Sequence, residues 1–187
     1  MGSMSLISWA FGIAEQKLAQ AIPRRWSHVQ GVARQARTLR GVAGSDAELL
    51  EAAAVLHDVG YAPDLAGVGF HPLDGARFLR TLEAPSRLVN LVAHHSYAVL
   101  EARLRGIDDE LDEFPDEGST AVRDALWYCD LTTTPDGETT SARERISEIK
   151  ERYGPKSLVT QFITEAGPEL MAAVDRTERR LAIIASS

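Results

Sequence analysis

All five histidines of this 187-residue chain lie between residues 28 and 95, and one of them forms the adjacent pair His57-Asp58. The pair ends an apolar run that begins near Glu51 and is followed by Gly60. A charged group beside an imidazole at the end of an apolar helix is costly to bury unless it is paired or binds a metal. We therefore interpret His57 and Asp58 as two ligands of a metal site.

The residues around this pair resemble the H…HD…D signature of the HD-domain superfamily of metal-dependent phosphohydrolases. His28 precedes the central pair, and Asp130 follows it near the end of a late predicted helix. The resemblance covers about residues 24–137, more than half of the chain. It implies an all-α fold in which His28, His57, Asp58 and Asp130 bind metal.

Three further histidines resemble the additional ligands of dinuclear HD proteins, which single-metal members lack. His71 precedes Pro72, and His94 and His95 are adjacent. Neighbouring helical residues point about 100° apart, so only one of His94 and His95 needs to bind metal, and we prefer His95. The alternative role of His71 is to cap the helix that begins at Pro72.

The resemblance implies two divalent cations, and imidazole ligands favour Fe, Mn, Co, Ni or Zn over Mg. Asp58 is the natural bridging carboxylate, which makes it a catalytic residue. Two metals about 3.5–4 Å apart can hold a bridging hydroxide and clamp a phosphoryl group. The sequence therefore predicts hydrolysis of a phosphate ester without a protein nucleophile.

Candidate substrate contacts lie near these ligands. Arg25 lies three residues before His28, on the same helix face, where a guanidinium would bind a phosphate and assist catalysis. The alternative is a surface salt bridge. Tyr61 and Thr133 are further candidates, although turn capping is the alternative for the threonine. Asp64 would serve as a proton donor or as a turn residue, and we favour the turn.

Apolar residues recur at helical spacing along most of the chain, and alternating strand-like runs are scarce. We predict one compact multi-helix bundle over residues 5–187, with a motif-bearing core at 24–137 and C-terminal helices within 141–185. Residues 1–4 resemble in part an expression scar. Capping boxes are predicted at Ser45–Glu48 and Ser141–Glu144. The predicted helices before residue 141 span 5–22, 24–42, 45–58, 72–82, 86–104 and 119–130. The predicted loops are 61–70, an acidic stretch at 108–118, and a turn at 132–137.

The composition is that of a globular protein, with 44% hydrophobic and 25% charged residues. The net charge of −7 argues against a nucleic-acid partner, which would require a basic surface. Cys129 is the single cysteine, and no apolar run is long enough to span a bilayer. We expect a cytoplasmic protein, with no membrane partner, that acts on a small phosphorylated substrate such as a nucleotide. Apolar faces on the terminal helices would serve either a homodimer or the core.

Two other functions use the same residues. The ligand set is similar to that of the mixed-valent di-iron oxygenases of the HD superfamily, although the phosphonate-cleaving members carry a histidine where this chain has Tyr61. The second alternative is a non-catalytic module that binds a nucleotide. Substrate-dependent O₂ uptake would identify the oxygenase, and ligand binding that is independent of metal would identify the module.

Overall fold

A computed structural model describes residues 4–186, so residues 1–3 of the predicted expression scar and Ser187 lie outside the described part. The described chain is helical and contains no strand beyond an isolated bridge between Thr133 and Thr139, which confirms the predicted all-α class. The α-helices are α1 (Leu6–Leu18), α2 (Pro23–Thr38), α3 (Arg40–Ala43), α4 (Ala47–Leu56), α5 (His71–Thr81), α6 (Ser86–Ala93), α7 (Ala98–Arg105), α8 (Asp108–Leu111), α9 (Ala121–Leu131), α10 (Ala142–Tyr153) and α11 (Leu158–Ala185). Short 3-10 segments are η1 (Gly44–Asp46), η2 (Val59–Tyr61), η3 (Pro63–Leu65) and η4 (His95–Tyr97).

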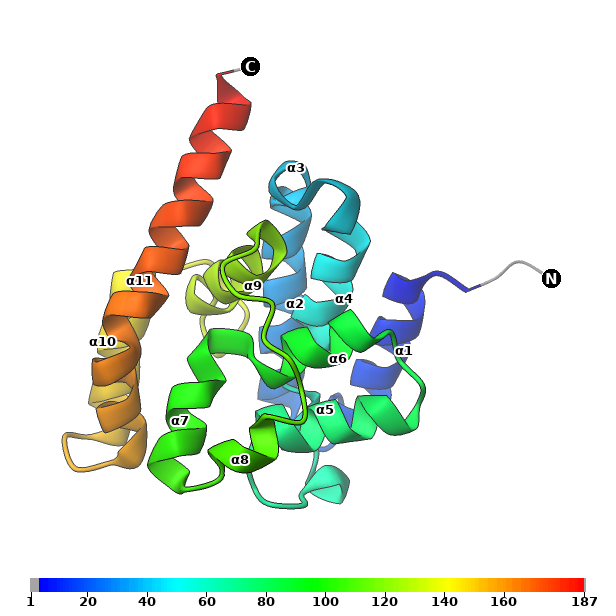
Figure 1. Ribbon diagram of the computed structural model, residues 1–187, viewed down its shortest axis with the longest axis vertical. Coiled ribbons are helices and arrows are strands. Elements are labelled where there is room, and N and C mark those ends of the chain that lie inside the picture. The colour runs from blue at the N-terminus through cyan, green and yellow to red at the C-terminus, as the bar shows by residue number, and fades with distance from the viewer. Residues whose placement is uncertain (1–3, 187) are drawn as a thin grey trace.

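Helix α4 forms the centre of the core. All of its residues from Leu50 to Leu56 are buried, because it is apolar around almost its whole circumference. It packs against α1, α2, α6 and α9, while α10 and α11 lie along one side of the bundle against α9 (Figure 1). The pair His57-Asp58 thus directly follows the buried half of α4.

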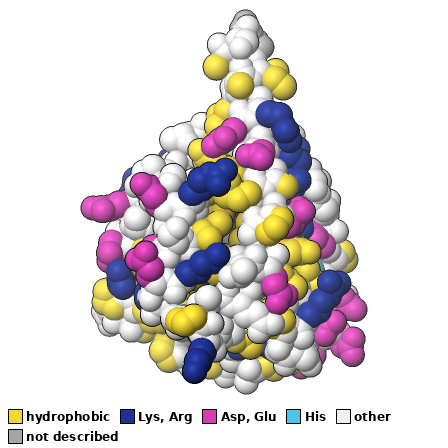
Figure 2. Space-filling view, turned by 90° about the vertical axis from the view of Figure 1, so that its left-hand side faces the viewer, with side chains coloured by type: hydrophobic (Ala, Val, Ile, Leu, Met, Phe, Trp, Pro, Cys, Tyr) yellow, Lys and Arg dark blue, Asp and Glu magenta, His cyan; other side chains and the backbone are white. Residues whose placement is uncertain are grey.

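The end of α11 extends beyond the rest of the molecule. Figure 2 shows hydrophobic side chains near this tip, where Ile183 and Ile184 are exposed. The homodimer suggested by apolar terminal faces stays a prediction. Among the described residues, no helix combines the length and the apolar character that crossing a membrane requires.

The predicted capping boxes had different outcomes. Ser141 and Glu144 form the predicted box at the start of α10. The box at Ser45 was wrong, because residues 44–46 form a 3-10 turn and α4 begins after Asp46 with no side-chain cap. The carboxylate of Glu48 instead accepts a hydrogen bond from the backbone of Leu6, 3.1 Å away, and so ties α4 to the start of α1.

Two predicted helices are each divided in the structure. The segment 24–42 breaks at Leu39 into α2 and α3. The segment 86–104 breaks between α6 and α7, because Ser96 and Tyr97 adopt positive φ values of 48° and 61°. This conformation is uncommon for residues other than glycine. The break turns the chain beside His95.

Two glycines permit the close approaches that hold the motif segments together. A Cβ atom at Gly31 would lie 2.4 Å from the carbonyl oxygen of Gly137, so glycine lets the 132–137 turn pack directly on α2. A Cβ atom at Gly60 would lie 2.0 Å from the carbonyl oxygen of His71. The glycine after the His57-Asp58 pair therefore allows the start of α5 to pack against it.

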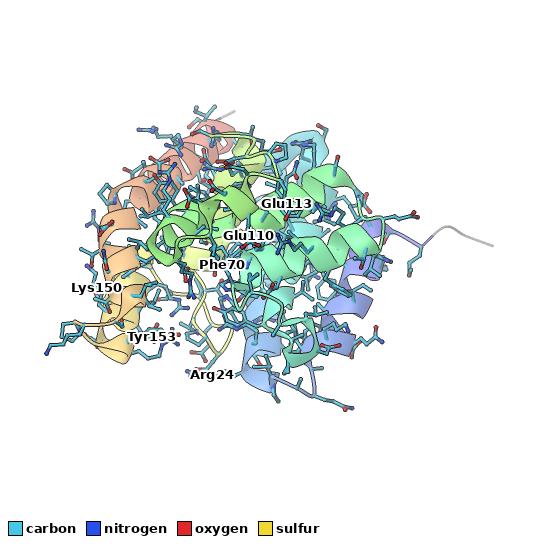
Figure 3. All side chains as sticks on the ribbon, turned by 60° about the horizontal axis from the view of Figure 1, so that its bottom comes forward. Arg24, Phe70, Glu110, Glu113, Lys150 and Tyr153 are labelled. Atoms are coloured by element: carbon cyan, nitrogen blue, oxygen red, sulfur yellow. The ribbon has the colours of Figure 1, made fainter. Side chains whose placement is uncertain are left out.

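The acidic segment 108–118, predicted as a loop, carries surface ion pairs. Residues 108–111 form the short helix α8 and not a loop. Glu110 and Glu113 lie together over α5 (Figure 3), and both pair with Arg77. These acids therefore attach a surface segment to α5.

Candidate metal centre

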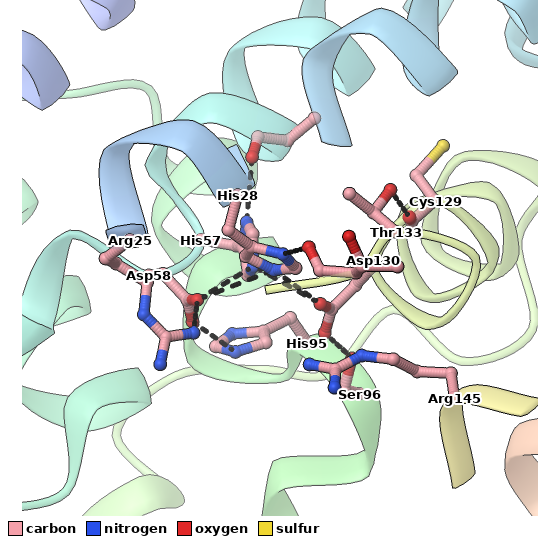
Figure 4. Close-up of polar contacts among 12 residues, drawn as sticks. Arg25, His28, His57, Asp58, His95, Ser96, Cys129, Asp130, Thr133 and Arg145 are labelled. Carbon is pink, nitrogen blue, oxygen red and sulfur yellow. Dashed lines mark hydrogen bonds and ion pairs between the residues drawn. The ribbon is translucent and has the colours of Figure 1, made fainter. Parts of the chain in front are cut away.

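Side chains from α2, the end of α4, η4 and α9 meet at one point inside the bundle (Figure 4). Two overlapping groups have potential ligand atoms that all lie within 4.8 Å of one another. One group is His28, His57 and Asp130, and the other is His57, Asp58 and His95. Residues that are up to 102 positions apart in the chain thus share one focus.

Backbone carbonyls fix the orientation of three imidazoles. A carbonyl oxygen only accepts, so the Nδ1 atom that contacts it carries a proton, and Nε2 is directed at the cluster. His28, His57 and His95 all have this arrangement. The accepting carbonyls belong to Thr134 at 2.9 Å, Ala54 at 2.7 Å and Val92 at 2.7 Å, respectively. Metal-binding histidines are characteristically oriented by a hydrogen bond of this kind.

The two carboxylates create a strongly negative field around His57. Its Nε2 atom is fully buried, has no hydrogen-bond partner, and lies 3.3 Å from Asp58 and 3.6 Å from Asp130. Burial lowers the pKa of His57, but the two negative charges outweigh that effect and raise it to about 10. Burial raises the pKa values of Asp58 and Asp130, yet nearby positive charge holds both well below the usual range. The site therefore stabilises positive charge, as a cation site must.

Asp58 directs its two oxygens toward different histidines. Oδ2 lies 3.3 Å from Nε2 of His57 and 3.8 Å from Nε2 of His28. Oδ1 lies 3.2 Å from Nε2 of His71 and 3.6 Å from Nε2 of His95. Burial lowers the pKa of His71, which favours the neutral imidazole that binds metals. One carboxylate thus lies between two separate pairs of nitrogen donors.

Asp130 is held from two sides. Its Oδ1 atom lies 3.0 Å from Nε2 of His28, and its Oδ2 atom accepts a hydrogen bond of 2.5 Å from the hydroxyl of Ser96. Ser96 is one of the positive-φ residues beside His95, and strained backbone of this kind occurs often at functional sites. No local sequence pattern indicates a role for Ser96, because its partner lies 34 residues away.

Arg25 belongs to the cluster and not to a surface salt bridge. Its guanidinium lies 2.6 Å from Oδ2 of Asp58 and 4.1 Å from the centre of the Tyr61 ring. The Tyr61 ring in turn stacks on His71, with the ring centres 3.9 Å apart. Burial raises the pKa of Tyr61, so its hydroxyl stays protonated. The two side chains form one edge of the opening to the cluster.

A pocket of about 350 Å³ opens on these residues. Besides the cluster, its lining includes Arg105 of α7 and several residues of α10 and α11. The α10 residues Arg145, Ile149 and Arg152 were not predicted, although their spacing of four and three residues puts them on one helix face. Together with Tyr153, they make α10 a wall of the pocket.

Three predicted candidates lie apart from the cluster. Nε2 of His94 donates to the carbonyl of Phe114 at 2.6 Å, so His94 faces away from the other histidines, and His95 occupies the cluster. Thr133 is fully buried, and its hydroxyl donates to the carbonyl of Cys129, so it is unavailable to a substrate. Asp64 is exposed and paired with Lys17, which agrees with the turn interpretation.

The comparisons with known proteins found one family. A family model described as "HD domain" matches residues 25–125, which include every cluster residue except Asp130. Helices α10 and α11 also lie outside the match. The chain matched no curated protein and no solved structure.

Proposed function

Because this chain belongs to the HD-domain family, we propose that it is a metal-dependent phosphohydrolase that cleaves a phosphate ester of a nucleotide or another small metabolite. The observation that supports the proposal most strongly is the position of Asp58, with one oxygen facing His57 and the other facing His71. A carboxylate between two sets of imidazoles is the arrangement that a pair of cations requires.

The donor set fits divalent transition metals. Nε2 of His57 is buried without a hydrogen-bond partner, and the imidazoles that are oriented by carbonyls direct Nε2 at the cluster, where a cation would displace any proton they carry. One ion would be held by His28, His57, Asp130 and Asp58, and a second by Asp58, His71 and His95. Bound ions of this kind supply Lewis acidity and lower the pKa of water.

The side chains around the ions have separate roles in this proposal. Arg25 binds the phosphate of the substrate, since its guanidinium lies at the pocket and carries donors beyond the one that contacts Asp58. Tyr61 supports Arg25 and His71 through its ring. Hydrolysis forms a P–O bond to the water oxygen and breaks the P–O bond to the alcohol, which leaves with a proton from that water.

Cys129 is unsuited to act as a nucleophile. It is fully buried next to Asp130, and burial raises the pKa of its thiol. Among the described residues it does not line the pocket at the cluster. This supports attack by water.

A phosphatase screen of the protein loaded with Mn, Co, Ni or Fe tests the proposal. We expect release of phosphate or a nucleotide product, and loss of that release in His57→Ala and Asp58→Ala. Asp64→Ala is the matched control, because Asp64 is an exposed aspartate paired with Lys17. Absence of turnover across nucleotides and sugar and aryl phosphates would contradict the proposal. Substrate-dependent O₂ uptake by the iron form would replace it with the oxygenase alternative.

A further inference from the structure

The pocket beside the cluster is basic, although the whole chain has a net charge of −7. Its lining holds the arginines Arg25, Arg105, Arg145 and Arg152, which come from α2, α7 and α10. Arg25 and Arg105 pair with acids that also line the pocket, Asp58 at 2.6 Å and Glu101 at 2.7 Å, while no such pair is formed by Arg145 or Arg152 among the described residues. Cations on the histidines and aspartates would add further positive charge. The pocket therefore favours an anionic ligand.

Arg145 is the buried member of this group. Only 8% of the residue is exposed, and its single carboxylate partner among the described residues is Glu148. In the view of Figure 4, Arg145 and Arg25 approach the cluster from opposite sides. The contact with Glu148 is made by one end of the guanidinium, which has five N–H donors in all, so further donors remain for a ligand. A phosphate oxygen in the pocket would accept from them.

The rest of the α10–α11 wall is apolar. Ile149 lies between Arg145 and Arg152 on the pocket-facing side of α10, and Phe162 and Ile163 come from α11. The polyhydroxylated ring of a sugar would find few hydrogen-bond partners on these side chains. A flat apolar ring would bury surface there at no cost in lost hydrogen bonds.

We infer that α10 and α11 form a substrate subsite in which Arg145, opposite Arg25, binds the phosphate while Ile149 and Phe162 receive an aromatic or apolar group attached to it. The inference rests on the proposed function and adds the substrate class. The preferred substrate carries an aromatic or similarly apolar group beyond its phosphate, which a simple sugar phosphate lacks. The subsite lies outside the residues matched by the family model, so it belongs to this chain's own C-terminal helices.

Calorimetric binding of two phosphonates of equal charge tests the subsite. Phenylphosphonate and methylphosphonate are titrated into metal-loaded protein. We expect the phenyl compound to bind about tenfold or more tightly, because its ring is buried against the apolar wall. Ile149→Asn reduces that preference to about threefold or less.

Charge variants test the arginine separately. Arg145→Gln is expected to weaken both phosphonates about tenfold, since it removes charge-assisted hydrogen bonds. Arg143→Gln is the matched control, because Arg143 is an exposed arginine on the same helix that lines a different pocket. Arg152→Gln, at an exposed position, gives a second variant if Arg145→Gln fails to fold, and its expected loss is about threefold.

The outcomes separate this inference from the proposed function. Equal binding of the two phosphonates by the wild type would overturn the subsite, as would Arg145→Gln and Arg152→Gln variants that bind like Arg143→Gln. Either result together with phosphoester turnover would leave the proposed function intact. Tight phenylphosphonate binding without turnover of any phosphoester would retain the subsite and overturn the hydrolase.

Discussion

Helix α9 carries two aspartates that the molecule uses in opposite ways. Asp124 is completely buried and faces α11, where Arg176 binds both of its oxygens at 2.8 and 2.9 Å and Arg180 binds one at 2.6 Å. Asp130, six residues later, faces His28 and the hydroxyl of Ser96. The first carboxylate has two permanently charged partners, and the second has an imidazole and a hydroxyl.

The difference distinguishes a structural carboxylate from one that we propose as a metal ligand. Arginine stays protonated in proteins, so the charge of Asp124 is compensated at all times and attaches α11 to the bundle. Imidazoles are neutral or charged according to what they bind, so Asp130 and Asp58 together attract a cation. Helices α10 and α11 also line the pocket. The ion pairs of Asp124 with α11 therefore hold in position the wall that we propose binds the substrate.

The variant with the largest expected effect on the proposed role of Asp130 is Asp130→Asn. Structural zinc sites with four protein ligands release about 10–16 kcal/mol on binding, so one ligand accounts for about 2.5–4 kcal/mol. We expect the affinity for Co²⁺ or Zn²⁺ to fall by a factor of about 100 or more, measured by competition with a chromophoric chelator. Helix content by circular dichroism should stay unchanged. Unaltered metal affinity would show that Asp130 is not a ligand.

The matched change at the other end of α9 is Asp124→Asn. It leaves two arginines without their buried partner, which lowers the free energy of unfolding by about 3 kcal/mol. This value is at the low end for a buried pair, because the arginines are partly exposed. Urea unfolding measures the loss. The metal affinity of the folded variant should remain within about threefold of the wild type. A large loss of metal affinity with little loss of stability would reverse the two assignments.

Removing metal from the wild type tests the same difference between Asp130 and Asp124 through protein stability. A ligand present at 100 times its dissociation constant stabilises the native state by about 2.7 kcal/mol. Treatment with a chelator should therefore lower the midpoint of thermal unfolding by about 5–10 °C. Asp130→Asn should lose most of this response, and Asp124→Asn should keep it. An equal response in both variants would mean that the metal binds elsewhere.

The smallest expected effect concerns Ser96, a positioning residue for Asp130. Ser96→Ala removes its hydrogen bond to Oδ2 of Asp130. Loss of a residue that hydrogen-bonds to a metal ligand typically lowers the metal affinity about 10–100-fold. We expect a loss near the lower limit, about tenfold, measured by the same chelator competition. Ser96→Gly should lose as much, although glycine tolerates the positive φ. Recovery in Ser96→Gly would instead indicate that backbone conformation, and not the hydroxyl, positions Asp130.

Local rules predicted much of the fold. The Ser141–Glu144 capping box and the proline in the first turn of α5 are short-range signals, and both helices begin where these signals indicated. The break between α6 and α7 was missed because the segment contains no glycine or proline. The contact from Ser96 to Asp130 joins the break to α9, 34 residues further on, and such a contact leaves no local signal.

The site was predictable to a similar extent. The pair His57-Asp58 was predictable because it is a polar pair at the end of an apolar helix. The other proposed ligands were predicted from the family resemblance. The choice between His94 and His95 depended on which imidazole faces the carbonyl of Phe114, a tertiary contact. Arg145 resembled a surface charge in the sequence, because only the packing of α10 over the pocket buries it.

The most direct test of the account is a calorimetric titration of the metal-free protein with Co²⁺, with His57→Ala titrated in parallel. His57 belongs to both groups of potential ligands, and its Nε2 atom is buried without a partner. The account predicts two bound ions per wild-type chain and a loss of tight binding in the variant. A wild type that binds no Co²⁺, or a variant that binds it equally well, would contradict it.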